Sequence, residues 1–211
     1  AREVIADTLG ADPREIVFTS GATEANNLAI RGAFEALSGV RQRRRVITLA
    51  SEHKAVLDTV AHLPDAEIVV LNPKSDGLID FAALDQALTE DTLLVSVMRV
   101  NNETGVIQPL EDISRRVHEV GALMHSDMAQ SVGKASVDVR ALGVDLASLS
   151  AHKIYGPKGV GVLYVRRSPE VVVSEQQHGG GHERGMRSGT LPTHQIVGMA
   201  EAFRLPNASL S

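Results

Sequence analysis

The stretch Thr92-Leu-Leu-Val-Ser-Val97 predicts a buried β-strand, because short runs that are almost entirely apolar lie in the interior of a sheet. Toward the N-terminus, a helical pattern at 81–88 separates this stretch from a β-branched run at 67–71. Toward the C-terminus, a helical pattern at 110–121 ends in glycine and is followed by an apolar run at 123–127. Strands and helices therefore alternate outward from residues 92–97.

The same alternation covers most of the chain. Further strands are expected at 15–19, 45–50, 145–150 and 161–165, and further helices at 24–37, 54–63 and 193–204. This order predicts an α/β fold, a three-layer sandwich with a mainly parallel sheet. The segment Ala1-Arg-Glu-Val4 resembles the middle of a helix, and the glycine-rich segment 178–190 is expected to be a loop. We expect one domain over 1–205 and a polar, frayed tail over 206–211.

Composition excludes several classes of function. Hydrophobic residues make up 43% of the 211 residues and charged residues 22%, with a net charge of −5, which is typical of a globular protein without a general attraction to nucleic acid or anionic membranes. No stretch approaches the roughly 18 apolar residues of a membrane span. There are no cysteines, so this chain supplies neither disulfides nor thiol chemistry. No metal site is predicted.

Two sequence features at strand ends could bind a ligand. Ligands of open parallel sheets bind where the strands end. Thr19-Ser-Gly-Ala-Thr-Glu24 lies between a strand and a helix, where free N–H groups and hydroxyls form an anion site, or where Ser20 or Thr23 only caps the helix. His53 follows another strand and could stack on a flat aromatic ligand, or cap a helix at the surface.

Two further strand ends carry an aspartate and a lysine. Asp127 ends an apolar strand, where a carboxylate is costly to bury without a partner such as a cationic ring nitrogen; capping of the next helix is the alternative. Lys153 follows a strand and precedes a Gly/Pro-rich turn, which suits a Schiff-base lysine, although an exposed surface lysine is the alternative. Ser150 and His152 could meet a phosphate. The spacing suits Asp127 and Lys153 on neighbouring strand ends.

Six motifs then connect the chain with a known family. They are Phe18-Thr-Ser-Gly-Ala-Thr-Glu-Ala-Asn-Asn, Glu52-His-Lys-Ala-Val-Leu-Asp, Val100-Asn-Asn-Glu-Thr-Gly, Asp127-Met-Ala-Gln-Ser-Val-Gly-Lys, Ser150-Ala-His-Lys-Ile-Tyr-Gly-Pro-Lys-Gly and His178-Gly-Gly-Gly-His-Glu-Arg-Gly-Met-Arg-Ser-Gly-Thr. With them the chain resembles the cysteine desulfurases of the class V aminotransferase family, in the group that serves iron–sulfur cluster assembly. The motifs run in family order up to about Phe203, and the last two are long and specific.

The resemblance implies a fold and a cofactor. The fold is the large domain of the PLP-dependent transferases (fold type I), and the cofactor is pyridoxal 5'-phosphate (PLP). By resemblance, Lys153 forms the Schiff base and shuttles protons, Asp127 keeps the ring nitrogen protonated, and His53 stacks on the ring and takes part in proton transfer. The remaining cofactor contacts are Gln130 and Asn102 near the phenolic oxygen, Ala22, Thr23, Ser150 and His152 at the phosphate, and Thr190 at the phosphate of the other subunit's cofactor.

The resemblance also implies an activity and partners. A desulfurase takes sulfur from L-cysteine, releases L-alanine and leaves a persulfide on a cysteine thiolate, which passes sulfur to an iron–sulfur scaffold protein. A homodimer is the expected form, in the cytoplasm for a bacterial protein or in the mitochondrial matrix for a eukaryotic one. Neither nucleic acid nor a membrane is an expected partner.

The sequence departs from the family in four respects. The persulfide cysteine is absent, and the small C-terminal domain and an N-terminal segment are expected to be missing, so an inactive fragment of a desulfurase is the leading interpretation. A natural short form, a non-catalytic PLP-binding partner of a full-length desulfurase, and a related class V lyase or aminotransferase remain alternatives. Arg99 stands where relatives often carry histidine and is expected to add charge near Asn102.

Overall fold

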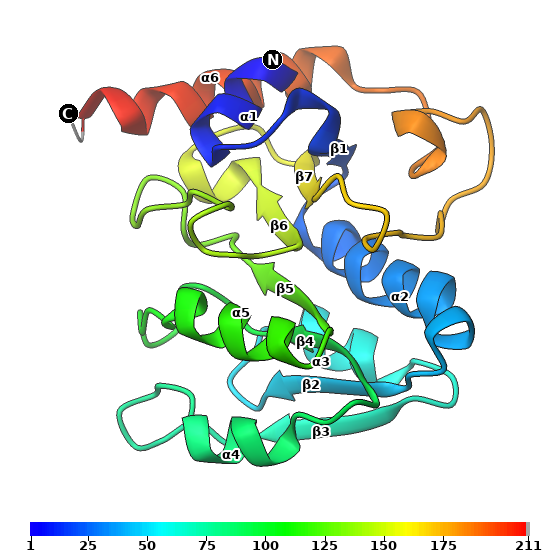
Figure 1. Ribbon diagram of the computed structural model, residues 1–211. Helices are drawn as coiled ribbons and strands as arrows, with labels where there is room; N and C mark the ends of the chain where they lie inside the picture. Colours follow the sequence, from blue (N-terminus) through cyan, green and yellow to red (C-terminus); the bar gives the residue numbers. More distant parts are fainter. Residues whose placement is uncertain (210–211) are drawn as a thin grey trace.

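The chain folds into a seven-stranded sheet that lies between two layers of helices (Figure 1). The computed structural model describes residues 1–209, with side chains for residues 1–205. The strands are β1 (Ile16–Thr19), β2 (Arg45–Leu49), β3 (Glu67–Leu71), β4 (Thr92–Ser96), β5 (Leu123–Asp127), β6 (Leu146–Ser150) and β7 (Gly161–Val165). Each lies within one residue of its predicted bounds, which confirms the strand predictions.

The sheet has the order β1-β7-β6-β5-β4-β2-β3 and is mainly parallel, as predicted. The pairs formed by β2, β3, β4, β5 and β6 are parallel, and only β7 runs against both of its neighbours. All strands except β7 therefore end at one edge of the sheet, and β7 begins there. Gly161, its first residue, is paired with both Thr19 and Ser150, the last residues of β1 and β6.

The helices cover the two faces because strand side chains alternate between them. Val46 of β2 packs in the core under α2 and α3, whereas Ile47 packs in the core under α1, α4, α5 and α6. The helices are α1 (Arg2–Leu9), α2 (Ala22–Arg41), α3 (Lys54–Ala61), α4 (Phe81–Ala87), α5 (Leu110–Glu119) and α6 (Thr193–Ser209). Figure 1 shows α1 beside α6, near the β1 end of the sheet. None of the helices in residues 1–209 combines the length and apolarity needed to span a bilayer.

Two helix ends differ from the prediction by more than two residues. Helix α2 continues to Arg41, four residues beyond its last apolar contact at Leu37, because its end is set by Gln42 in a left-handed conformation (φ 55°) rather than by the apolar pattern. Helix α6 continues past Arg204 to Ser209 and so includes four residues of the expected tail. The last two residues of that tail, 210 and 211, lie outside the described residues.

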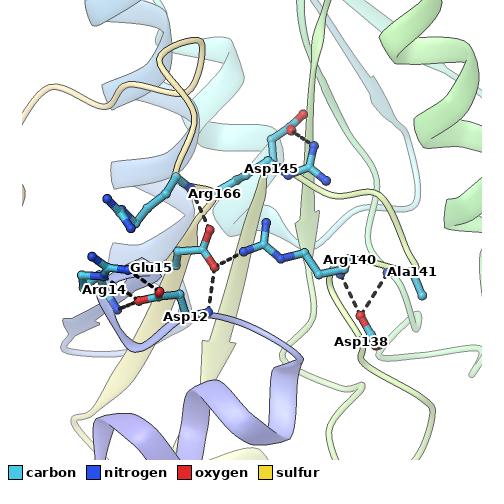
Figure 2. A network of polar contacts seen from close by, with 9 residues as sticks. Asp12, Arg14, Glu15, Asp138, Arg140, Ala141, Asp145 and Arg166 are labelled. Atoms are coloured by element: carbon cyan, nitrogen blue, oxygen red, sulfur yellow. Dashed lines mark hydrogen bonds and ion pairs between the residues drawn. The ribbon is translucent and has the colours of Figure 1, made fainter.

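The edge where the strands begin is held by ion pairs (Figure 2). Glu15 is fully buried, and its carboxylate accepts hydrogen bonds from the Arg140 guanidinium at 2.6 Å and the Arg167 backbone N–H at 2.7 Å. Asp145 precedes β6 and pairs with Arg166 at 3.0 Å. Each of these two buried carboxylates has an arginine partner, so this edge has a structural role.

A histidine joins the three central strands. His125 on β5 is fully buried; its Nδ1 lies 2.8 Å from Ser96 Oγ on β4 and its Nε2 lies 3.0 Å from Ser148 Oγ on β6. Burial lowers its pKa to about 3, so the ring is neutral in the folded protein.

We predict that His125 makes the protein less stable in acid. Between its usual pKa of 6.5 and about 3, the unfolded chain binds a proton that the folded chain does not, so stability falls as the pH drops through this window. The slope from this group is at most about 1.4 kcal/mol per pH unit. The free energy of unfolding in urea, measured for the wild type and for His125→Gln at pH ~7 and ~5, gives this slope, because the variant lacks the titrating histidine. An equal pH dependence in both proteins would contradict the prediction.

Candidate functional site

A cavity of about 510 Å³ opens at the edge where the parallel strands end. It is built by the start of α2, the connection from β2 to α3, and the segments that follow β4, β5 and β6. Its lining residues are Ser20, Gly21, Ala22, Thr23, Glu24, Asn26, His53, Ala55, Met98, Val100, Asn102, Asp127, Ala129, Gln130, Ser150, His152, Lys153, Lys158 and Gly159.

Nine of the ten predicted site residues line this cavity. They are Ala22, Thr23, His53, Asn102, Asp127, Gln130, Ser150, His152 and Lys153. Thr190 is exposed and does not line it; its predicted contact with the cofactor of another subunit stays a prediction. The Arg99 side chain is not among the cavity lining; its Nη1 bonds the Gln108 carbonyl oxygen and lies 3.7 Å from Glu111 of α5, and its expected effect near Asn102 stays a prediction.

The start of α2 forms one wall. Gly21 caps this helix without any side-chain hydrogen bond to the first-turn amides, and its φ of 153° with ψ of −179° is a conformation that glycine tolerates best. A Cβ at Gly161 would lie 2.6 Å from the Gly21 Cα and 2.6 Å from the Leu149 carbonyl oxygen. The absence of a side chain at Gly161 lets the helix begin directly against the sheet edge, where its N–H groups can bind an anion.

Asp127 is the buried acid of the cavity, with 6% of its surface exposed. One carboxylate oxygen accepts a hydrogen bond from the Asn26 side-chain amide at 2.7 Å, and the other accepts one from the Ala129 N–H at 2.9 Å. Burial raises the pKa of Asp127 above its usual value, and these two donors with the nearby His53 and Lys153 offset only part of that rise. Asn26 was missed by the sequence analysis; the signal was an amide on the apolar, sheet-facing side of a helix.

Of the two alternatives for His53, the helix cap is confirmed, and stacking on a ligand stays a prediction. The His53 Nδ1 accepts a hydrogen bond from the Ala55 N–H at 3.0 Å, so the ring caps α3. The ring also lines the cavity. Because Nδ1 is an acceptor, Nε2 carries the proton of the neutral ring, and the cap fixes how the ring is oriented.

The segment after β6 contributes three groups in four residues. Ser150 Oγ lies 2.7 Å from His152 Nδ1. Burial, with the charges of Lys153 and Lys158, lowers the pKa of His152. Lys153 lies in a single 3₁₀ turn that ends at Tyr155 in a left-handed conformation (φ 64°), and within residues 1–209 its amine makes no hydrogen bond or ion pair. Lys158, which the sequence analysis did not select, lines the same cavity.

The glycine-rich segment 178–190 is anchored beside the cavity. Arg187 pairs with Glu24 in the first turn of α2 at 2.7 Å. Glu183 is buried at 6% exposure, accepts the Phe18 N–H at 2.9 Å and pairs with Arg2, although its φ of 50° is unfavourable for a residue with a side chain. The predicted loop therefore contains fixed contacts that the sequence did not reveal.

The lining fits pyridoxal phosphate. Asp127 is buried with two neutral donors and, in the described part of the chain, no ion-pair partner, which suits a cationic ring nitrogen. The uncapped start of α2, with Ser150 and His152, suits a phosphate. The unbonded amine of Lys153 suits an aldehyde.

Comparisons with known families and curated proteins agree on one group. The aminotransferase class-V pattern matches residues 1–210. The cysteine desulfurase IscS of Tolumonas auensis is 59% identical, aligned over 100% of this chain and 52% of its own length. The cysteine desulfurase IscS of Vibrio vulnificus is 59% identical over 97% of this chain and 51% of its own length. The chain thus spans about half the length of the curated relatives it matches.

Solved structures of similar proteins have the same fold as this chain. A NifS-like protein superimposes with a TM-score of 0.94 at 42% identity, covering 99% of this chain and 57% of the other. DndA from Streptomyces lividans gives a TM-score of 0.91 at 43% identity, covering 99% and 60%. A structure of SspA in complex with cysteine gives 0.88 at 47% identity, covering 96% and 58%.

We predict that Gly161→Ala destabilises the fold and displaces the start of α2. The added methyl would meet backbone atoms, which cannot move aside as a flexible side chain can, so a loss of about 1–3 kcal/mol is expected. Gly39→Ala is the matched control, because Gly39 lies in α2 with open space around it and should be neutral or stabilising by up to about 1 kcal/mol. Urea unfolding of both variants tests the prediction, and equal stability of the two would contradict it.

Proposed function

Because the chain belongs to the class V aminotransferase family, whose members depend on pyridoxal phosphate, we propose that residues 1–205 form the cofactor-binding domain of a cysteine desulfurase. The observation that carries this proposal is the meeting of Asp127 and Lys153 in one cavity, a buried carboxylate and an unbonded amine at neighbouring strand ends. Identity of 59% to two cysteine desulfurases supports the choice of reaction.

The proposed chemistry divides between the cofactor and the side chains. When bound, PLP supplies an aldehyde that condenses with amines and a ring that takes up the electron pair released at the substrate α-carbon. Lys153 contributes the amine that holds the aldehyde and later moves the α-proton. Asp127, oriented by Asn26 and the Ala129 N–H, keeps the ring nitrogen protonated. His53 covers the ring, with its orientation fixed by the α3 cap.

The remaining lining residues orient the cofactor in this proposal. The amides of Ala22 and Thr23, with the hydroxyls of Thr23 and Ser150 and the His152 ring, hold the phosphate at the positive end of α2. Gln130 and Asn102 donate to the phenolic oxygen. Lys134 supports this role for Gln130, because its amine bonds the Gln130 carbonyl oxygen at 2.5 Å and leaves the amide N–H groups free to donate.

The proposed substrate is L-cysteine, whose carbon–sulfur bond is cleaved to give L-alanine and a persulfide. The structure of SspA with cysteine is 47% identical to this chain, which supports cysteine as the ligand. The 211 residues contain no cysteine, so the thiol that receives the sulfur atom is not among them.

We also propose the partners and compartment of the complete protein. A homodimer would bring the exposed Thr190 of one subunit to the cofactor phosphate of the other. An iron–sulfur scaffold protein would accept the sulfur. The similar desulfurases are bacterial, which supports the cytoplasm of a bacterium as the site of action.

We predict that PLP attaches to Lys153 and to no other lysine. Borohydride reduction of the protein with PLP, followed by peptide mass spectrometry, should find the phosphopyridoxyl group on the peptide that contains Lys153. Lys153→Ala should abolish the adduct. Lys158→Ala is the control, because this second cavity lysine should leave the adduct in place. An adduct that survives in Lys153→Ala, or none in the wild type, would rule out the proposed site.

A further inference from the structure

A second buried carboxyl lies beside the proposed cofactor site. Glu52 follows β2 and is 6% exposed. Its Oε1 accepts a hydrogen bond from the Met98 N–H at 2.7 Å. Its Oε2 is buried and has no hydrogen-bond partner in the described part of the chain. A buried oxygen without a hydrogen-bond partner would destabilise the folded chain if it carried a negative charge.

Glu52 connects two walls of the cavity. Its neighbour His53 lines one side, and Met98, whose N–H it bonds, lines another. A second bond runs alongside, from the Asn101 side-chain amide to the Ser51 carbonyl at 2.8 Å. The segment that carries His53 is therefore tied at two points to the segment that follows β4.

We propose that Glu52 is an uncharged positioning residue, which fixes the His53 wall to the segment after β4 and leaves the negative charge of the Glu52–Asp127 pair on Asp127. This inference rests on the proposed function, because it concerns how the PLP site is held and charged. A carboxylic acid with its proton on Oε2 keeps Oε1 as the acceptor for Met98 and removes the cost of a buried, unpaired charge.

The two carboxyls differ in what stabilises their charge. Asp127 has two hydrogen-bond donors and faces His53 and Lys153. Glu52 has one donor, and the charged group that faces it is Asp127 itself. Burial first, and then the Asp127 charge, raise the pKa of Glu52 well above its usual value. Two neighbouring buried carboxyls favour one charge over two, and these surroundings give that charge to Asp127.

Infrared spectroscopy tests the protonation state without the cofactor. At pH ~7, where an ordinary glutamic acid with a pKa of about 4.3 is ionised, the PLP-free wild type should show the carbonyl stretch of a protonated carboxyl. Glu52→Gln should lose this band. Asp127→Asn should keep it, and Glu90→Gln, at an exposed position, should also keep it. A wild type without the band, or a band removed by Asp127→Asn alone, would overturn the proposal.

PLP titration tests the positioning role. Glu52→Gln keeps a neutral acceptor for Met98 and should bind PLP within about threefold of the wild type, whereas Glu52→Ala should bind it at least about tenfold more weakly. The proposal would be overturned if both variants bound PLP equally weakly, or if neither bound it more weakly than the wild type. If the wild type itself bound no PLP, the proposed function would fail, while the infrared band would still decide the protonation state of Glu52.

Discussion

The contact between two glycines, Gly21 and Gly161, is the constraint on which the site depends. Because Gly161 has no side chain, the start of α2 can lie against this first residue of β7, where β1 and β6 end. From that position α2 crosses one face of the sheet and brings Asn26 within 2.7 Å of Asp127 on β5. This close approach of the two backbones thus positions the start of α2, which can bind an anion, and also Asn26, which bonds the buried Asp127.

The electrostatics of the cavity follow from which elements meet there. The segments after β2, β4, β5 and β6 converge because parallel strands end at one edge. They supply Glu52, the Met98 N–H, Asp127 and Lys153 respectively. A carboxylate with two donors and an amine that bonds no other group among the described residues then face the same space, an arrangement that suits a cationic, carbonyl-bearing ligand.

The sequence predicted the strands well and the supporting contacts poorly. Apolar runs such as 92–97 define strands locally, and chemistry-bearing residues at strand ends, including Asp127 and Lys153, follow from the parallel order. The bond from Asn26 to Asp127 joins residues 101 positions apart, and no local pattern encodes it. The pairing of Arg187 with Glu24 spans 163 positions and was missed for the same reason.

Buried carboxyl groups at the two edges of the sheet differ in their bonding partners. Where the strands begin, Glu15 and Asp145 each have an arginine within 3.0 Å, so burial there costs little and serves stability. Where the strands end, Asp127 and Glu52 are buried without an arginine or lysine bonded to them in the described residues. A folded chain retains such an arrangement where a ligand compensates the charge, as proposed for Asp127, or where a proton removes it, as proposed for Glu52. This asymmetry supports, independently of any motif, the proposal that the functional site lies at the edge where the strands end.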